Sequence, residues 1–401
     1  MCSRFAALLL LVLTLLPAAA RGQERAWQWT LPPWLPPPLA PADNPMSAAK
    51  VELGRHLFYD ARLSADGTVA CSTCHAQRLA FTDGRAHPVG VSGEAHPRSA
   101  MMLANVAYQP VLTWANPLVA RLEQQALLPL FGEAPVEMGM AGRETELTAR
   151  LATDPAYEAM FARAFPDQGG AITLVTITRA LASFQRSLIS ADAPYDRYRF
   201  GGNRDAIPAA ARRGEMLFFG ERMECFHCHG GPHFTDSVAH TRKPLAEYGF
   251  HNTGLYNLGG TGAYPRGGEG LYEHTGEPSD MGRFRAPSLR NVAVTAPYMH
   301  DGSVPTLRAA IAHYAAGGRT IAAGPAAGRG ARNPWKSPFV QGFRITAREV
   351  DDLVAFLESL TDERFLSDPA HADPWPLGHP ARAARRDAAD PPPSPPQEPS
   401  P

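Results

Sequence analysis

The sequence predicts a mainly α-helical fold made of two similar domains, with long loops and little β structure. Apolar residues recur at helical spacing over residues 177–188 and 350–360, whereas no convincing alternation of apolar and polar residues marks a strand. One local pattern also occurs twice: a helical segment ending in Leu-Phe, then Cys-x-x-Cys-His, then Phe-Thr-Asp. Because a repeated pattern of this kind is typical of a duplicated unit, we expect two domains of the same type.

The amino terminus has the order of regions found in a secretory signal. Residues 5–16 are an apolar run behind Arg4 with Thr14 as its one polar residue, and small residues follow at positions 17–20. A single membrane-spanning helix is the alternative, but the run is shorter than the roughly 20 residues that a bilayer requires. We therefore expect a signal peptide over residues 1–22, export to the periplasm, and no membrane span once the signal is removed.

The rest of the chain divides into two domains between proline-rich ends. Residues 23–45 form a lead-in that we expect to be extended, and residues 367–401 form a tail that we expect to be disordered at its end. Between them, residues 46–204 and 205–366 each hold one copy of the repeated pattern. The 401 residues carry a formal net charge of −1, which argues against nucleic acid as a partner.

Several helix boundaries are marked in the sequence. Thr346 and Glu349 form a capping-box pair ahead of the second apolar run. Pro208 suits the first turn of a helix that precedes the second cysteine pair. We expect another helix over residues 306–316, and a long loop over residues 248–280, which are rich in glycine and polar residues.

Every cysteine that remains after removal of the signal lies in a Cys-x-x-Cys pair with a histidine directly behind it. The residues concerned are Cys71, Cys74, His75, Cys225, Cys228 and His229. Four cysteines in an exported chain would ordinarily suggest a disulfide framework. That interpretation is weakened here, because the chain is long enough to form a core without cross-links and because a histidine follows each pair.

The Cys-x-x-Cys-His pattern is the attachment motif of c-type haem, in which two thiols add to the haem vinyl groups and the histidine binds the iron. Zinc is one alternative, but paired zinc motifs usually lie about 15 to 20 residues apart, whereas Cys225 follows Cys74 by 151 positions. A thioredoxin-like redox pair is another, but it does not explain the two histidines. We predict two covalently bound haems c, with His75 and His229 as proximal ligands.

Longer stretches resemble the di-haem cytochrome c peroxidase and MauG family. They lie at residues 50–64, 135–139 and 287–302, and they occur in the family's order around both haem motifs. The resemblance extends over residues 42–365. It implies two cytochrome c-like haem domains and a reaction with hydrogen peroxide.

The resemblance also implies which residues face the open side of the first haem. The family's distal glutamate falls on Glu137 and its distal glutamine on Gln125, with two extra residues between them at about positions 131–134. A carboxylate over an open haem iron moves a proton from the inner to the outer peroxide oxygen, so that the O–O bond breaks heterolytically. Gln125 can donate hydrogen bonds to bound oxygen or water. A solvated loop acid is the alternative for Glu137.

Two further positions follow from the resemblance. Trp114 falls where the family has a tryptophan between the haems that relays an electron or a hole, and a buried core tryptophan is the alternative. Tyr314 falls where ordinary di-haem peroxidases have a methionine and MauG-like enzymes have a tyrosine as ligand to the second haem. A phenolate oxygen favours ferric and higher-valent iron. The alternative is a helix tyrosine that packs on the porphyrin without binding iron.

Calcium between the two domains is another implication of the resemblance. The family's carbonyl ligands match Thr295 and Pro297, whereas its asparagine ligand falls on Ser99. Loss of the amide oxygen leaves carbonyl oxygens and waters, which calcium accepts as ligands. One Ca²⁺ is therefore expected.

Within the family, residues 112–117 and 130–133 most resemble the branch that includes MbnH, the di-haem enzyme of methanobactin operons. That branch is understood to oxidise a tryptophan of a partner protein, MbnP, to kynurenine. The resemblance thus implies an exported enzyme that uses hydrogen peroxide to reach a high-valent iron state and oxidises a side chain of a small exported protein. The alternatives are a cytochrome c peroxidase fed with electrons by a small cytochrome or cupredoxin, and a non-enzymatic di-haem electron carrier.

Overall fold

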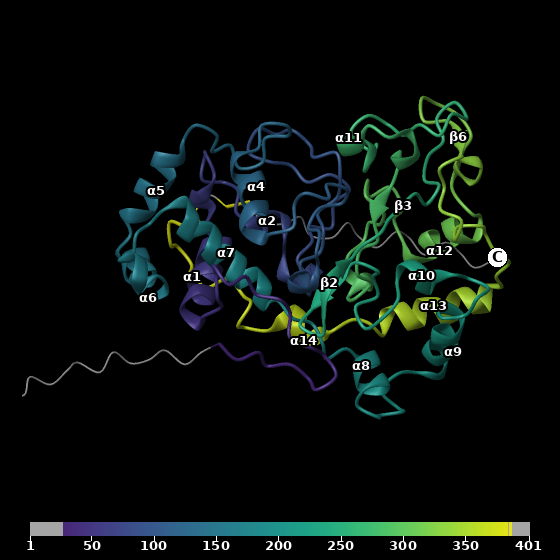
Figure 1. Ribbon diagram of the computed structural model, residues 1–401, viewed down its shortest axis with the longest axis horizontal. Helices are drawn as coiled ribbons and strands as arrows, with labels where there is room; N and C mark the ends of the chain where they lie inside the picture. Colours follow the sequence, from purple (N-terminus) through teal and green to yellow (C-terminus); the bar gives the residue numbers. More distant parts are fainter. Residues whose placement is uncertain (1–26, 384, 387–401) are drawn as a thin grey trace, which may run out of the picture.

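The computed structural model describes residues 27–383 together with 385 and 386, and its fold is mainly helical, as predicted. The expected signal peptide and residues 387–401 of the tail lie outside the described residues. Figure 1 shows an elongated molecule with the first half of the chain at one end and the second half at the other. The helices of the first half are α1 (Ala48–Phe58), α2 (Cys71–Cys74), α3 (Leu122–Gln125), α4 (Leu127–Phe131), α5 (Glu144–Ala152), α6 (Pro155–Ala164) and α7 (Leu174–Ser187).

The second half has longer loops between its helices. These helices are α8 (Pro194–Arg199), α9 (Ala209–Phe218), α10 (Cys225–Cys228), α11 (Tyr272–Thr275), α12 (Leu307–Ala315), α13 (Ala347–Glu358) and α14 (Glu363–Ser367). In the described residues, the β-strands form three antiparallel pairs: β1 (Val238–His240) with β2 (Lys243–Glu247), β3 (Phe250–His251) with β4 (Phe284–Arg285), and β5 (Thr320–Ile321) with β6 (Gly328–Arg329). The prediction of little β structure is confirmed.

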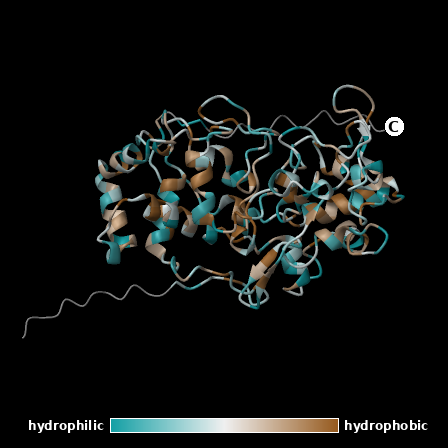
Figure 2. Cartoon of the chain, turned by 45° about the horizontal axis from the view of Figure 1, so that its top comes forward, coloured by the Kyte–Doolittle hydropathy of each residue, from teal (hydrophilic) through white to brown (hydrophobic). Residues whose placement is uncertain are grey.

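Several of the long helices begin where a side chain satisfies one of their first backbone N–H groups. Thr346 and Glu349 form the predicted capping box at the start of α13. Thr306 caps α12 by accepting a hydrogen bond from the amide of Ala309. Figure 2 shows helices with both teal and brown residues at the two ends of the molecule, as expected for helices with one solvent-facing and one buried side.

Two details differ from the sequence predictions. Pro208 is the N-cap of α9 and does not lie in its first turn, a shift of one position. The stretch 248–280 is mostly loop, as predicted, but it also contains β3 and the short helix α11. The first difference is a one-residue shift at a helix end, and the second concerns two short elements.

Each half contains two helices that cross at a glycine. Helix α1 packs on α7, and α9 packs on α13. A Cβ atom on Gly54 would lie 2.0 Å from the carbonyl oxygen of Ala180, and one on Gly214 would lie 2.0 Å from that of Asp352. Both glycines stand three residues before the Leu-Phe pair of the repeated pattern. The repeat is therefore Gly-x-x-Leu-Phe, and its glycine allows the close helix crossing.

The two halves have separate apolar cores. The first core includes Leu53, Leu57, Phe58, Ile177, Leu181 and Phe184. The second core includes Phe218, Phe234, Ile311, Leu353, Phe356 and Leu357. Tyr195 of α8 packs in the second core, while Phe365, Trp375 and Ala381 pack in the first. The end of the described chain thus returns to the first half, where Figure 1 shows it in yellow beside α1. The domain limits themselves stay a prediction.

The proline-rich lead-in is ordered over its described part and contacts later segments. The Tyr108 hydroxyl donates a hydrogen bond to the carbonyl oxygen of Pro36 at 2.8 Å, and the Thr241 amide donates to that of Pro37 at 3.0 Å. Leu35, directly before these contacts, is buried. Among the described residues, no helix has the length and apolar character needed to cross a membrane.

Candidate active site

Each Cys-x-x-Cys-His motif forms a short helical turn, and each turn faces its own cavity. The cavity in the first half has a volume of about 450 Å³ and is lined by Cys71, Cys74, His75, Gln125, Glu137 and Trp114 among others. The cavity in the second half, of about 240 Å³, is lined by Cys225, Cys228, His229 and Tyr314 among others. The first and second cavities, as we name them, therefore bring together the residues that the sequence analysis assigned to the first and second haems.

The ring of His75 is held in one orientation. Its Nδ1 lies 2.7 Å from the carbonyl oxygen of Phe81. Because a carbonyl only accepts, Nδ1 carries the proton and Nε2 keeps the lone pair that a metal requires. Burial lowers the pKa of His75, so the ring is neutral at neutral pH.

The second cavity repeats this arrangement. Nδ1 of His229 lies 3.1 Å from the carbonyl oxygen of Phe234, and burial lowers the pKa of His229 as well. Phe81 and Phe234 both have positive φ, 64° and 52°, which is uncommon for residues other than glycine. The Phe of the repeated Phe-Thr-Asp thus orients the histidine of each motif. The repeat is evident in the sequence, but the part that its Phe takes in orienting the histidine is not.

The structure argues against the other interpretations of the cysteine pairs. The pairs line separate cavities, so they do not share one zinc ion. The four cysteines form no disulfide in the described part of the chain. Burial raises the pKa of Cys71, Cys74 and Cys225 to about 12, whereas a redox-active thiol of the thioredoxin type has a lowered pKa.

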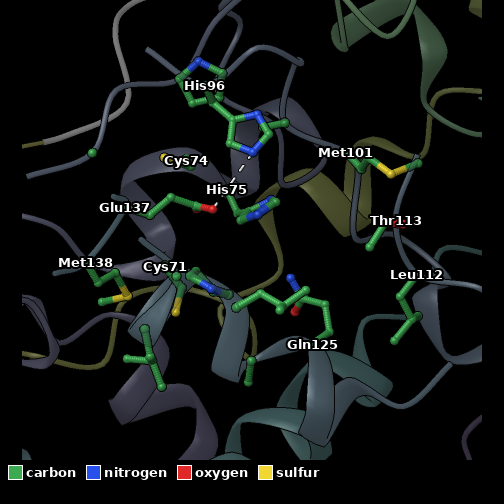
Figure 3. A pocket seen from close by; sticks show the side chains of 18 of the residues that line it. Cys71, Cys74, His75, His96, Met101, Leu112, Thr113, Gln125, Glu137 and Met138 are labelled. Atoms are coloured by element: carbon green, nitrogen blue, oxygen red, sulfur yellow. Dashed lines mark ion pairs between the residues drawn. The ribbon is translucent and has the colours of Figure 1, made fainter. Parts of the chain in front are cut away.

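Glu137 lines the first cavity in an environment suited to proton transfer. Burial raises the pKa of Glu137 to about 7. The backbone of this segment packs directly on Gly90, and the Val91 amide donates to the Glu137 carbonyl oxygen at 2.7 Å. Nε2 of His96 lies 3.9 Å from the Glu137 carboxylate, as the dashed line in Figure 3 marks. His96 could not be identified from the sequence, because it lies 41 positions before Glu137 in a loop without a motif.

Gln125 reaches the same cavity from the last residue of α3. Figure 3 shows its side chain in the same cavity as those of Glu137 and His75. The extra residues between Gln125 and Glu137 form a turn in which Glu133 pairs with Val136. The amide of Met138 then donates to the carbonyl oxygen of Pro129 at 2.9 Å, which returns the chain to the cavity.

Trp114 lines both cavities. Its Nε1 donates a hydrogen bond to the carbonyl oxygen of Ser99 at 2.9 Å, and its own carbonyl oxygen accepts one from the Arg285 amide at 2.9 Å. These contacts come from both halves of the chain and fix the indole between the cavities.

Tyr314 lies on α12 and lines the second cavity. Burial raises the pKa of Tyr314, and negative charge on Cys228 and Cys225 would raise it further. Met299 lines the same cavity, so this cavity also contains a thioether sulfur. His313 faces elsewhere: its Nε2 contacts the carbonyl oxygen of Thr253 at 3.0 Å.

The residues expected to bind calcium all line the second cavity, namely Ser99, Thr295 and Pro297. The Ser99 hydroxyl donates a hydrogen bond to the carbonyl oxygen of Met299 at 3.1 Å. The structure brings the three residues into one region, between the two halves.

Comparison with known proteins identifies the class to which this fold and these cavities belong. The family model for di-haem cytochrome c peroxidases matches residues 48–205, and one for RoxA-like, cytochrome c-like proteins matches residues 283–313. The cytochrome-c peroxidase IdrP1 of Denitromonas iodatirespirans is 35% identical over 85% of this chain and 88% of its own length. The chain belongs to the di-haem cytochrome c peroxidase and MauG family.

Two further matches are MauG or MauG-like proteins. The methylamine utilization protein MauG of Methylorubrum extorquens is 35% identical over 80% of this chain and 81% of its own length. The crystal structure of a MauG-like protein associated with microbial copper homeostasis is 49% identical, with a TM-score of 0.85, over 88% of this chain and all of that one. The diheme peroxidase BthA from Burkholderia thailandensis shares the fold at 22% identity, with a TM-score of 0.61. The chain is thus an oxidoreductase of a family whose members bind two haems c.

Proposed function

We propose that this protein is an exported enzyme that uses hydrogen peroxide to oxidise a side chain of a small exported partner protein, as MauG-like enzymes do. The observation that carries the proposal is the position of Trp114, which lines two cavities with different polar groups. The first cavity contains Glu137 and Gln125, and the second contains Tyr314. Similarity to a MauG-like protein associated with copper homeostasis supports a protein substrate and, by resemblance to MbnH, oxidation of a tryptophan.

The residues present fit two haems c. His75 and His229 each have Nδ1 bonded to a carbonyl, which leaves Nε2 for iron. Cys71 with Cys74 and Cys225 with Cys228 would attach the vinyl groups. When bound, the haems supply the redox chemistry of the reaction with peroxide.

Glu137 would act as the acid–base group of the first cavity. As a carboxylate it accepts the proton of one peroxide oxygen, and it returns this proton to the other oxygen as water leaves. Gln125 would donate a hydrogen bond to the substrate oxygen. His96 lies next to this group, with Nε2 3.9 Å from the Glu137 carboxylate.

Tyr314 would supply an oxygen ligand in the second cavity. An anionic oxygen stabilises more oxidised iron than a thioether does, which suits a centre that stores an oxidising equivalent.

A second candidate function is that of a cytochrome c peroxidase. Met299 in the same cavity favours it, because methionine is the corresponding ligand in ordinary di-haem peroxidases. A simple electron carrier is disfavoured, because electron transfer requires neither an acid–base group such as Glu137 nor a hydrogen-bond donor such as Gln125.

The experiment compares the two functions directly. The purified diferric holoenzyme is mixed with peroxide and either the small exported protein encoded beside its gene or a reduced small cytochrome c. We expect peptide mass spectrometry to find one modified tryptophan in the partner protein and only slow oxidation of the cytochrome. Rapid cytochrome oxidation that requires prior reduction of the enzyme, without tryptophan modification, would establish the peroxidase function.

We also propose that one Ca²⁺ binds between the halves at Ser99, Thr295 and Pro297, and that the mature protein lies in the periplasm. The three residues line one cavity, and carbonyl and hydroxyl oxygens are ligands that calcium accepts. Metal analysis of the holoenzyme before and after chelation tests the ion. Fractionation of cells with an antibody tests the location.

A further inference from the structure

A row of aromatic rings leads away from the second cavity. Phe284 and His300 both line this cavity, and their rings stack with centroids 3.7 Å apart and an interplanar angle of 12°. The Tyr264 ring lies 6.4 Å from that of His300, and the Tyr256 ring lies 5.4 Å from that of Tyr264. The row therefore continues through two phenols.

The tryptophan that lines both cavities packs against the same cluster as these rings. Phe284 and Tyr264 belong to one buried apolar cluster, and Trp114 and Tyr256 pack against it. Tyr264 is buried, whereas Tyr256 is partly exposed. The cluster thus connects the space between the two cavities with the surface of the protein.

The two phenols have different hydrogen-bond partners. The Tyr264 hydroxyl donates to the amide oxygen of Asn252 at 2.8 Å. The Tyr256 hydroxyl donates to the carboxylate of Asp301 at 2.6 Å. A carboxylate accepts a proton readily and an amide oxygen does not, so only Tyr256 has a base for its phenolic proton.

A nearby cation makes this base necessary. The guanidinium of Arg319 lies 4.4 Å from the centre of the Tyr256 ring. A positive charge there opposes the removal of an electron from the ring, unless the phenolic proton leaves at the same time. Asp301, which lies 3.9 Å from Arg319, offsets that charge and can receive the proton.

Other phenols that donate hydrogen bonds to carboxylates do not lie in the cluster against which Trp114 packs. Tyr157 donates to Asp60 and Tyr195 donates to Glu215, but both rings are buried within the main cores. Neither ring belongs to the cluster that contacts Trp114. Among these three phenols of the described chain, only Tyr256 combines a carboxylate partner, partial exposure and a link to the second cavity.

We propose that Tyr264 and Tyr256 form a branch that carries oxidising equivalents from the haem centres to the surface, with Tyr256 as the residue that oxidises the partner protein. This inference rests on the proposed function, in which peroxide is the oxidant and is reduced to water. In each step Tyr256 loses one electron to the oxidised haem pair, its O–H bond breaks, and the proton binds the carboxylate of Asp301. The tyrosyl radical then takes one electron from the partner side chain and regains its proton. Two such steps use the two oxidising equivalents of one peroxide.

The test uses holoenzymes with two haems and peroxide alone, without a partner. Freeze-quench electron paramagnetic resonance is recorded for wild type, Tyr256→Phe, Asp301→Asn and the control Tyr248→Phe, which alters an exposed tyrosine outside the cluster. Stopped-flow absorption follows the first reaction with peroxide in the same samples. We expect a tyrosyl radical in wild type and Tyr248→Phe, and none in Tyr256→Phe.

The first reaction with peroxide should have the same rate in all four proteins, because none of the changes lies in the first cavity. Asp301→Asn should form the radical about 100-fold more slowly, since it lacks the proton acceptor. A radical trap located by peptide mass spectrometry gives a second readout at Tyr256. An unchanged radical and an unchanged trapping site in Tyr256→Phe would overturn the relay. A wild type that does not react with peroxide would instead overturn the proposed function.

Discussion

Glu137 of the first cavity and Tyr314 of the second are oxygen groups of different kinds. Burial raises the pKa of Glu137 to about 7, so this carboxyl changes its protonation state near neutral pH. Burial also raises the pKa of Tyr314, so its phenol keeps its proton unless a cation binds the oxygen. The first cavity therefore contains a group suited to proton transfer, and the second contains a group suited to binding an oxidised metal.

Glu137→Gln should slow the first reaction with peroxide by about 100- to 10,000-fold while both haems stay bound, because the amide cannot accept a proton. The raised pKa also predicts the pH dependence of the wild type. Below pH 7 the carboxyl is mostly protonated, so the rate should rise as the pH increases through about 7 and level off above it. Stopped-flow absorption at a series of pH values measures both effects.

Glu94→Gln is the matched control, because Glu94 lines the same cavity. This variant should keep the rate and the pH profile of wild type. If Glu137→Gln reacted within a few-fold of wild type, or kept the same pH profile, another group would be the proton acceptor.

Tyr314→Met should raise the reduction potential of the second haem by on the order of 100 mV, because a neutral thioether stabilises ferric iron less than a phenolate does. Haem content should stay at two. A redox titration monitored by absorption measures the potential, and electron paramagnetic resonance of the resting enzyme identifies the low-spin centre. An unchanged potential and spectrum would show that Tyr314 is not a ligand and would make Met299 the next candidate.

The site residues differ in how far the sequence could identify them. The haem motifs are evident because thioether attachment fixes the spacing of Cys71, Cys74 and His75. His96 could not be identified, since only the fold brings its Nε2 to 3.9 Å from Glu137. The role of Phe81 as the acceptor for His75 depends on a positive φ, which the residue type does not indicate.

At the scale of elements, the duplicated unit is a helix crossing joined to a haem motif. Gly54 and Gly214 allow α1 and α9 to lie against α7 and α13 at the carbonyls of Ala180 and Asp352. Each crossing places a Leu-Phe pair at the end of the helix that precedes the motif. The geometry of each cavity therefore depends on one glycine.

Gly214→Ala should lower the free energy of unfolding by about 1 to 3 kcal/mol, because the added Cβ would lie 2.0 Å from the Asp352 carbonyl oxygen. Helix propensity alone predicts the opposite sign, a gain of about 1 kcal/mol for alanine over glycine. Denaturant unfolding followed by circular dichroism decides between the two effects. Met216→Ala on the exposed side of α9 is the control, with an expected change near zero. A Gly214→Ala protein as stable as wild type would show that the helices separate without cost.

Helices with a clear capping signal were predictable, and elements held by distant contacts were not. The capping box of Thr346 and Glu349 determines the start of α13 locally. In contrast, Trp375 joins the first core through long-range contacts, including a hydrogen bond from its Nε1 to the His56 carbonyl oxygen at 2.9 Å. A proline-rich composition predicts an extended chain for such a tail but does not reveal what it packs against.

At the scale of the whole molecule, the two halves meet at Trp114. Its indole donates a hydrogen bond to Ser99, its carbonyl oxygen accepts one from Arg285, and the residue lines both cavities. Family resemblance predicted a tryptophan between the haems, but periodicity and composition alone would not distinguish it from a core residue. The contact with the cluster of Tyr264 became evident only in the fold.

Trp114→Phe should slow electron transfer between the two haems. Phenylalanine keeps most of the packing but is much harder to oxidise than indole, and loss of the hydrogen bond to Ser99 should cost only about 1 kcal/mol of stability. We expect two bound haems and a first reaction with peroxide within a few-fold of wild type, because Glu137 and Gln125 are unchanged. Spectral changes at the second haem should then appear about tenfold or more slowly, as a barrier higher by about 1.4 kcal/mol would produce. Stopped-flow absorption resolves the two phases, and Trp34→Phe in the lead-in is the control, which should keep both rates. If the second phase kept its rate in Trp114→Phe, the oxidising equivalent would have to cross between the halves by another route.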